Sequence, residues 1–246
     1  MNHSLSPRTQ FINGVKAELP LLIGVLPFGM IYGVLALEAG LPPSIAQAMS
    51  AIVFAGSSQF VATQMISISA PMIIIVLTIG VVNLRHILYS ASIAPYLQQL
   101  RPLWKWLLAY LLTDEAYAVT IAYYQKDSHP YSGEHPPPSS ISYMYLENKH
   151  WFYLGAGLTL WCTWQASTAI GILFGMIIPT GWSLDFTLAL TFIAILVPLL
   201  RNRGSIIVSI VAGLVAILSV DLPYMLGLVV ASIVGILVGL WMEGSG

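Results

Sequence analysis

Long apolar runs dominate the pattern of hydrophobic and polar positions along the chain. A helix needs roughly 20 mostly apolar residues to cross about 30 Å of hydrocarbon, and most of these runs are long enough. The short alternating segments of a membrane β-barrel do not occur. The pattern therefore predicts an all-α, polytopic membrane helix bundle that forms one transmembrane domain over residues 1–246. The runs cover about 19–37, 43–70, 71–97, 103–124, 151–178, 184–200, 204–220 and 222–242.

Aromatic and basic residues near the ends of the runs indicate how the runs are oriented. Tryptophan and tyrosine gather at membrane interfaces, and lysine and arginine gather on the cytoplasmic side. The aromatic residues in question are Trp104, Trp106, Tyr123, Tyr124, Trp151, Tyr153, Trp182, Tyr224 and Trp241. The basic clusters are Arg8 with Lys16, Arg101 with Lys105, and Arg201 with Arg203.

All three basic clusters become cytoplasmic if two of the runs do not cross fully. We expect 43–70 and 184–200 to be broken or re-entrant, which leaves about six full spans. Gly56-Ser57-Ser58-Gln59 gives the first of these runs a polar centre, whereas the second has none. This topology predicts that both termini are cytoplasmic and that the polar segment 125–150 forms an outer loop.

The two halves of the chain resemble each other weakly. The tetrapeptide at 28–31, Phe-Gly-Met-Ile, recurs at 174–177 and is followed in both places by a short turn and another apolar run. We expect repeats over 17–124 and 151–242 with opposite orientations in the membrane. Inverted repeats of this kind build secondary transporters, whose substrate sites lie near the midplane where helices are broken.

Composition supports the membrane assignment and excludes several classes of function. Of the 246 residues, 57% are hydrophobic and 8% are charged, whereas soluble domains carry about 25% charged residues. The net charge of −1 gives no reason to expect a nucleic-acid partner. No nucleotide-binding G-x4-G-K-[ST] motif and no signal peptide are evident, and we expect no cofactor. The lone Cys162 excludes an intrachain disulfide and is interpreted as a small buried residue.

The outer loop offers one alternative, a metal site. His129, Glu134 and His135 could act as ligands there. Because no cysteine accompanies them and prolines surround them, we interpret the loop as a solvated connector and expect no metal.

The first run carries helix-disrupting and small residues. Pro27 removes a backbone donor and would free carbonyl groups within the membrane, close to Phe28 and Tyr32. Gly24, Gly29 and Gly33 recur at a spacing that favours close packing against another helix. We expect Pro27, Phe28 and Tyr32 to contribute to a substrate site.

The segment 54–60, Phe-Ala-Gly-Ser-Ser-Gln-Phe, is the second motif. An unwound turn here would expose backbone amides and carbonyls together with the side chains of Ser57, Ser58 and Gln59. Such groups hold an ammonium and a carboxylate without a buried net charge. The alternative is hydrogen bonding between helices. Gly56 and these three residues are candidate substrate-binding residues.

The third and fourth motifs bring ionisable residues into apolar runs. Asn83, Arg85 and His86 precede Tyr89, and an arginine within hydrocarbon must face protein or water unless it reaches the interface. Asp114 and Glu115 follow Thr113 about ten residues into the next run.

Distance along the helices suggests how these groups pair. Residue 85 lies about 15 positions before the turn at 100, and residue 114 lies about 14 after it. Equal depth makes Arg85 or His86 a partner for Asp114 or Glu115, and the second carboxylate is left for a proton or a substrate amine. A purely structural ion pair is the alternative. We predict that Asn83 contributes to substrate binding and that the other four form a coupling site.

Taken in order, these motifs resemble the AzlC-type branched-chain amino acid permeases, the large subunits of LIV-E exporters. The resemblance runs from about 11 to 242, and it is strongest for 54–60, 83–89 and 113–115. The family commonly has alanine where this chain has Ser57, so an extra hydroxyl would shift substrate preference.

The resemblance implies a membrane transporter, not an enzyme. It implies export of branched-chain amino acids, valine especially, across the bacterial inner membrane, with a small hydrophobic AzlD-type partner subunit. We add proton coupling as a hypothesis based on the acidic pair. Two alternatives stay open: an intramembrane serine hydrolase using Ser57 or Ser58 with His86, and a channel or scaffold subunit without carrier activity.

Overall fold

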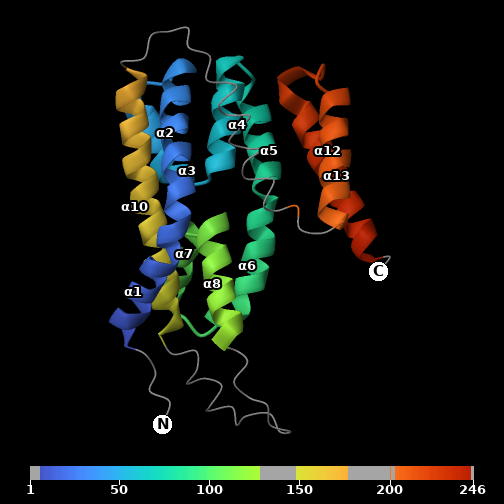
Figure 1. Cartoon of the computed structure of the whole chain (residues 1–246). Helices are drawn as coiled ribbons and strands as arrows, with labels where there is room; N and C mark the ends of the chain where they lie inside the picture. Colours follow the sequence, from blue (N-terminus) through green and yellow to red (C-terminus); the bar gives the residue numbers. More distant parts are fainter. Residues whose placement is uncertain (1–5, 128–147, 177–199, 201–202, 245–246) are drawn as a thin grey trace.

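The computed structural model describes residues 6–127, 148–176, 200 and 203–244 (Figure 1). Within these ranges the chain forms helices and no strands, which confirms the all-α prediction. Two helical stretches there, Pro7–Glu38 and Met72–Leu97, are long and apolar enough to cross a membrane. The count of six full spans is not established by the described residues.

Two long helical columns pack in parallel at one side of the bundle (Figure 1). The first consists of α1 (Pro7–Glu18), a 3₁₀ turn η1 (Leu19–Leu21) and α2 (Leu22–Glu38), and the second is α10 (Lys149–Gly175). A Cβ on Gly171 would collide with the backbone of Met30, and one on Gly33 would collide with the backbone of α10. The predicted role of the α2 glycines in packing is thus confirmed for Gly29 and Gly33, but Gly24 has no atom within 4 Å of such a Cβ.

A half-length helical hairpin follows the first column. Helix α3 (Pro43–Val53) and helix α4 (Gly56–Ser67) are each about 16–18 Å long, roughly half the hydrocarbon thickness. Between them Phe54 takes a left-handed backbone conformation with φ 39°, and Ala55 is extended. The predicted break in 43–70 is therefore confirmed, and we call α3–α4 the first hairpin.

The next column runs back along the bundle with a break in its middle. It consists of α5 (Met72–Val82) and α6 (Leu84–Leu97), separated at Asn83. A second hairpin follows, made of α7 (Pro102–Tyr110) and α8 (Asp114–Asp127). It enters the bundle from the end opposite to the first hairpin (Figure 1).

The prediction that 103–124 crosses fully is wrong, because a new helix begins at Asp114. The N–H of Ala116 donates to Thr113 Oγ1 at 3.3 Å, so Thr113 caps that helix. Asp114 and Glu115 in its first turn complement the positive end of its dipole. The chain therefore turns back at Leu111–Thr113.

The second hairpin also changes the predicted topology. Tyr123 at the far end of α8 donates to Gln10 Oε1 at 2.8 Å, and Tyr124 donates to the carbonyl oxygen of Lys149 at 3.0 Å. Helix α1 and both chain positions that flank the polar loop thus lie at one end of the bundle. The predicted topology requires α1 and these flanking positions to lie at opposite ends of the bundle, whereas the described residues place them at the same end.

The tips of the two hairpins meet inside the bundle. Tyr110 of the second hairpin donates a hydrogen bond to the carbonyl oxygen of Ala51 in the first, and its ring lies 6.0 Å from that of Phe54. The hairpins therefore lie end to end, and the second covers a backbone carbonyl near the turn of the first.

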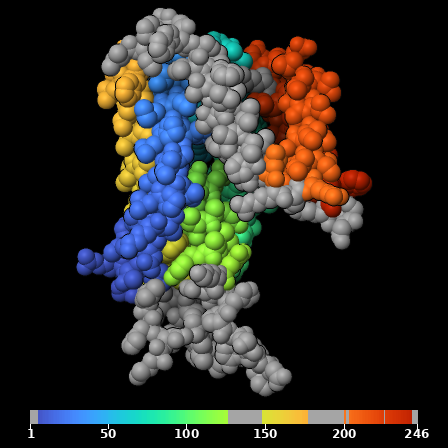
Figure 2. Space-filling view, viewed as in Figure 1, coloured from blue at the N-terminus to red at the C-terminus, as the bar shows by residue number. Residues whose placement is uncertain are grey.

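Helix α12 (Arg203–Leu218), the turn η2 (Pro223–Met225) and helix α13 (Leu226–Gly244) form a further pair at the side of the bundle (Figures 1 and 2). Apart from Leu200, the predicted re-entrant element 184–200 lies outside the described residues, as do His129, Glu134 and His135. The repeat and the loop therefore remain predictions. Cys162 is exposed on α10, so its interpretation as a buried residue was wrong.

We predict that Gly171→Ala destabilises the protein by about 1–3 kcal/mol, because the added methyl group overlaps the Met30 backbone, which cannot move aside. Thermal unfolding in detergent measures the effect. Gly24→Ala on α2 is the matched control and should unfold no earlier than the parent protein, since its methyl group meets open space. Equal midpoints for the two variants would contradict the close packing of α2 against α10.

Candidate functional site: a polar cavity at the hairpin tips

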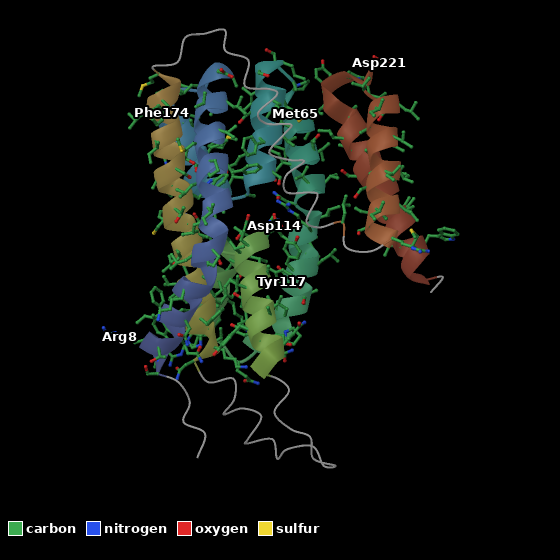
Figure 3. All side chains as sticks on the ribbon, viewed as in Figure 1. Arg8, Met65, Asp114, Tyr117, Phe174 and Asp221 are labelled. Carbon is green, nitrogen blue, oxygen red and sulfur yellow. The ribbon has the colours of Figure 1, made fainter. Side chains whose placement is uncertain are left out.

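A cavity of about 600 Å³ lies where the hairpin tips meet the broken column α5–α6. Figure 3 shows the depth of this region: Asp114 lies between Arg8 at one end of the molecule and Phe174 and Asp221 toward the other. The lining combines ionisable and polar groups with aromatic and aliphatic side chains. It consists of Leu21, Val25, Phe28, Phe54, Ala55, Gly56, Ser57, Arg85, His86, Tyr89, Thr113, Asp114, Glu115, Tyr117, Ala118, Leu160 and Trp164.

Three helix N-termini converge on this cavity. Helices α4, α6 and α8 begin there, at Gly56, Leu84 and Asp114. A helix N-terminus carries a partial positive charge and backbone N–H groups that lack partners within the helix. The α8 terminus is neutralised by its own carboxylates, whereas the α4 terminus has no side-chain cap. The amides at the start of α4 are therefore suited to bind an anion.

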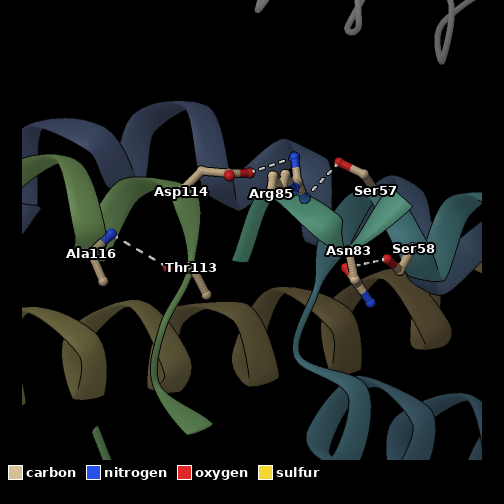
Figure 4. Close-up of polar contacts among 7 residues, drawn as sticks. All are labelled: Ser57, Ser58, Asn83, Arg85, Thr113, Asp114 and Ala116. Carbon is tan, nitrogen blue, oxygen red and sulfur yellow. Dashed lines mark hydrogen bonds and ion pairs between the residues drawn. The ribbon is translucent and has the colours of Figure 1, made fainter. Parts of the chain in front are cut away.

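An ion pair joins the second hairpin to the broken column (Figure 4). Arg85 Nη1 lies 2.8 Å from Asp114 Oδ2, and the side chains are 29% and 40% exposed. This exposure reflects contact with the cavity, since both residues line it. The predicted pairing of the basic motif with the acidic motif is confirmed in its geometry, with Arg85 and Asp114 as the partners.

Two hydrogen bonds join the first hairpin to the same column (Figure 4). Arg85 Nη2 donates to Ser57 Oγ at 3.2 Å, and Ser58 Oγ donates to Asn83 Oδ1 at 2.7 Å. Arg85 therefore contacts both hairpins at once. The break at Asn83 is held against α4, which keeps the start of α6 at the cavity.

Aromatic side chains form the apolar part of the wall. Trp164 of α10 donates its indole N–H to Gln59 Oε1 at 3.1 Å, and this contact fixes the ring beside Gly56. The Tyr89 and Tyr117 rings stack at 4.4 Å with an interplanar angle of 13°. The cavity thus has a rigid apolar side next to its ionisable side.

The structure divides the residues that the sequence singled out into three groups. Phe28, Gly56, Ser57, Arg85, His86, Asp114 and Glu115 line the cavity. Tyr32, Ser58, Gln59 and Asn83 stand behind this lining and support it through hydrogen bonds, including one from Tyr32 to the Ala46 carbonyl at 2.9 Å. Pro27 lies on the exposed side of α2, away from the lining, and α2 continues through it.

Sequence reasoning missed part of the wall. Trp164 comes from α10, and no local pattern shows that it faces a turn more than a hundred residues earlier. Tyr117 follows Thr113 by four positions, which is the spacing of one helix face, so it could have been found once a helix start was recognised there.

Comparison with known proteins assigns the chain to a family. The model of the family described as AzlC protein matches residues 20–178, which include both hairpins and the lining residues from Leu21 to Trp164. The chain belongs to the AzlC protein family. This AzlC-family chain is therefore a membrane protein of the transporter type, and its apolar runs had already indicated the membrane.

Several curated relatives of this AzlC-family chain are membrane proteins. The inner membrane protein YgaZ of Escherichia coli is 26% identical over 94% of this chain and 91% of its own length. An uncharacterized membrane protein of Archaeoglobus fulgidus is 31% identical over 82% of this chain and 81% of its own. One from Helicobacter pylori is 32% identical over 48% and 53%. No solved structure matches the chain.

We predict that a cysteine at position 57 reacts with a charged methanethiosulfonate reagent roughly ten-fold or more faster than one at position 58. Ser57 lines the cavity, whereas Ser58 is fully buried against Asn83. The variants Ser57→Cys and Ser58→Cys are compared in a Cys162→Ser background, because Cys162 is exposed. Similar rates at both positions would show that the cavity does not admit water where the structure places it.

We also predict a favourable coupling between Arg85 and Asp114 in a double-mutant cycle. The coupling free energy should be about 0.5–3 kcal/mol, toward the lower end because both side chains are partly exposed. The coupling is calculated from the free energies of unfolding, measured in mixed micelles, of the parent protein, Arg85→Gln, Asp114→Asn and the double variant. The exposed Arg101 is the control, and Arg101→Gln should be additive with Asp114→Asn.

Proposed function

We propose that this chain is the large subunit of a secondary transporter that exports branched-chain amino acids such as valine. In this proposal it acts in the bacterial inner membrane with a small AzlD-type hydrophobic subunit, and export is coupled to protons. The main support for this proposal is the cavity at the hairpin tips. It is lined by the N-terminus of α4, by the acidic pair Asp114 and Glu115, and by an apolar wall.

The substrate carboxylate is assigned to the start of α4. Backbone N–H groups at Gly56 and Ser57 and the positive end of the helix attract an anion there, without a further buried charge. Arg85 lies beside these groups, donating to Ser57, and adds a positive potential. The hydroxyl of Ser57, which accepts a hydrogen bond from Arg85, would therefore lie next to the bound substrate carboxylate.

The substrate ammonium is assigned to the acidic pair at the start of α8. Asp114 is already paired with Arg85, so Glu115 is the carboxyl group left for a substrate amine or a proton. A zwitterion would then lie between two helix starts, with opposite charges facing its two ends. Glu115 and Asp114 are the proposed proton carriers, and Arg85 is their counter-charge.

The branched side chain is assigned to the apolar wall. Phe28, Leu160 and Trp164 provide aliphatic and aromatic surface beside the start of α4. A volume of about 600 Å³ is within the range of small-molecule sites and leaves room for a small amino acid with some water. Such a wall favours apolar over charged side chains.

The contacts of the two serines favour transport over the hydrolase alternative. Among the described residues, Ser58 donates to Asn83 and Ser57 accepts from Arg85, and neither hydroxyl is hydrogen-bonded to His86. A serine nucleophile needs a base within hydrogen-bond reach. Flux that saturates with substrate concentration would indicate a carrier, whereas a channel or a scaffold subunit would not show it.

We predict saturable counterflow of labelled valine in proteoliposomes that contain the chain and its small subunit. Glu115→Gln and Asp114→Asn should each lower the rate about ten-fold or more, because each removes one charged contact with the substrate or with Arg85. Glu38→Gln and Asp221→Asn change exposed acids elsewhere and serve as matched controls. If neither cavity variant differs from the parent protein, the acidic pair is not the coupling site.

A further inference from the structure

Glu18, at the end of α1, carries a fully buried carboxyl group that the site described above does not use. Its side chain is 0% exposed, and neither carboxyl oxygen has a hydrogen-bond partner among the described residues. An ionised carboxylate without a partner is strongly disfavoured in such surroundings, whereas a protonated carboxyl group is tolerated. The surroundings of Glu18 therefore favour the protonated form of its carboxyl group.

The helices packed against α1 show which group acts on this carboxyl. They are α8 and α10, in addition to the turn η1. Their charged and titratable residues are Asp114, Glu115, Tyr117, Tyr123, Tyr124, Lys126 and Asp127 on α8, and Lys149, His150, Tyr153 and Cys162 on α10; Lys126 lies at the far end of α8, about 16 Å along the helix from Glu115. In the first turn of α8, which packs against α1, Asp114 is paired with Arg85, so Glu115 is the acidic residue there whose negative charge would oppose ionisation of Glu18.

The nearest cations along the neighbouring helices lie elsewhere. Gly14 packs between Phe152 and Ala156, and Gly33 packs farther along α10 against Thr168 and Ile172, so the two columns run in parallel. Lys149 is therefore level with the first turn of α1, about nine residues or ~13 Å along the axis from Glu18. Lys16 is on α1 itself, but its side chain is exposed. Arg85 is held by Asp114 and Ser57. The charge on Glu18 would thus have no close counter-ion among these residues.

Glu115 connects this buried group to the cavity. It lines the cavity, and its neighbour Asp114 has taken Arg85 as a partner. Two nearby carboxyl groups in a poorly solvated place do not both ionise readily. We propose that Glu18 and Glu115 hold one proton between them, with Glu18 as a storage position behind the cavity wall that exchanges with the cavity through Glu115.

The exchange moves one proton and one negative charge in opposite directions. The O–H bond of the Glu18 carboxyl breaks, a water molecule entering from the cavity relays the proton to a carboxylate oxygen of Glu115, and the negative charge passes from Glu115 to Glu18. Glu115 then releases the proton to water in the cavity. The use of this proton in export rests on the proposed transport function, whereas the sharing of the proton does not.

Infrared difference spectroscopy of the purified protein in lipid vesicles tests the shared proton directly. At neutral pH we expect a C=O stretching band of a protonated carboxyl group that is lost in Glu18→Gln. In Glu115→Gln the same band should shift, because the neighbouring charge has been removed. Glu38→Gln changes an exposed glutamate and should leave the band unchanged.

Two results would overturn the inference: the band survives in Glu18→Gln, or it is lost there but neither shifts nor titrates differently in Glu115→Gln. Should Glu18→Gln fail to fold, as judged by size-exclusion chromatography, Glu18→Asp keeps the carboxyl group and must move the band. An unmoved band in that variant would equally assign the proton to another residue.

Transport measurements then separate this inference from the proposed function. Glu18→Gln should lose proton-driven accumulation of valine but keep counterflow, since exchange of substrate needs no net proton movement. Retained accumulation in that variant would rule out a coupling role for Glu18. If the parent protein shows no valine counterflow, the proposed function fails, and the infrared result still decides whether the two carboxyls share a proton.

Discussion

Backbone groups without partners cannot face hydrocarbon, and this constraint determines how the two hairpins must lie. Each hairpin turns inside the bundle, so each tip exposes N–H and carbonyl groups that need protein or water nearby. The tips meet where Tyr110 binds the Ala51 carbonyl and packs against Phe54, and residues of both tips line the cavity. The polar site is thus a direct consequence of stopping two helical pairs half-way.

Arg85 stabilises this arrangement because it contacts both tips. It pairs with Asp114 at the start of α8 and donates to Ser57 near the start of α4. Its own position follows from the break at Asn83, which Ser58 holds. One arginine therefore makes the relative position of three helix starts interdependent, and a change at any of them reaches the others.

The sequence predicted the parts of this fold that depend on local chemistry. Gly56-Ser57-Ser58-Gln59 predicted the first break, and counting residues from the turn at 100 predicted the depth at which Arg85 meets the acidic pair. The second break was missed because Thr113-Asp114-Glu115 was interpreted as charge within a continuous span, although a capping residue followed by two acids is also a helix start. That error placed the end of α8 at the end of the bundle opposite to α1, whereas the two lie together.

Long-range packing could not be predicted in the same way. Trp164 joins the cavity wall only because α10 runs parallel to α2 in a register set by glycine contacts between the two helices. Glu18 lies at the edge of an apolar run, where an acidic residue is unremarkable until α8 and α10 are seen to close over it. Both residues depend on contacts between segments distant in the chain.

Hairpins that enter from opposite ends also shape the electric field. A full-length helix spreads the membrane potential over about 30 Å of hydrocarbon. Where water follows a half-length hairpin inward, the same potential drops across a thinner layer of protein. The work of about 2.3 kcal/mol per elementary charge per 100 mV is then done over a short displacement, so small movements near Arg85 and Asp114 become sensitive to voltage.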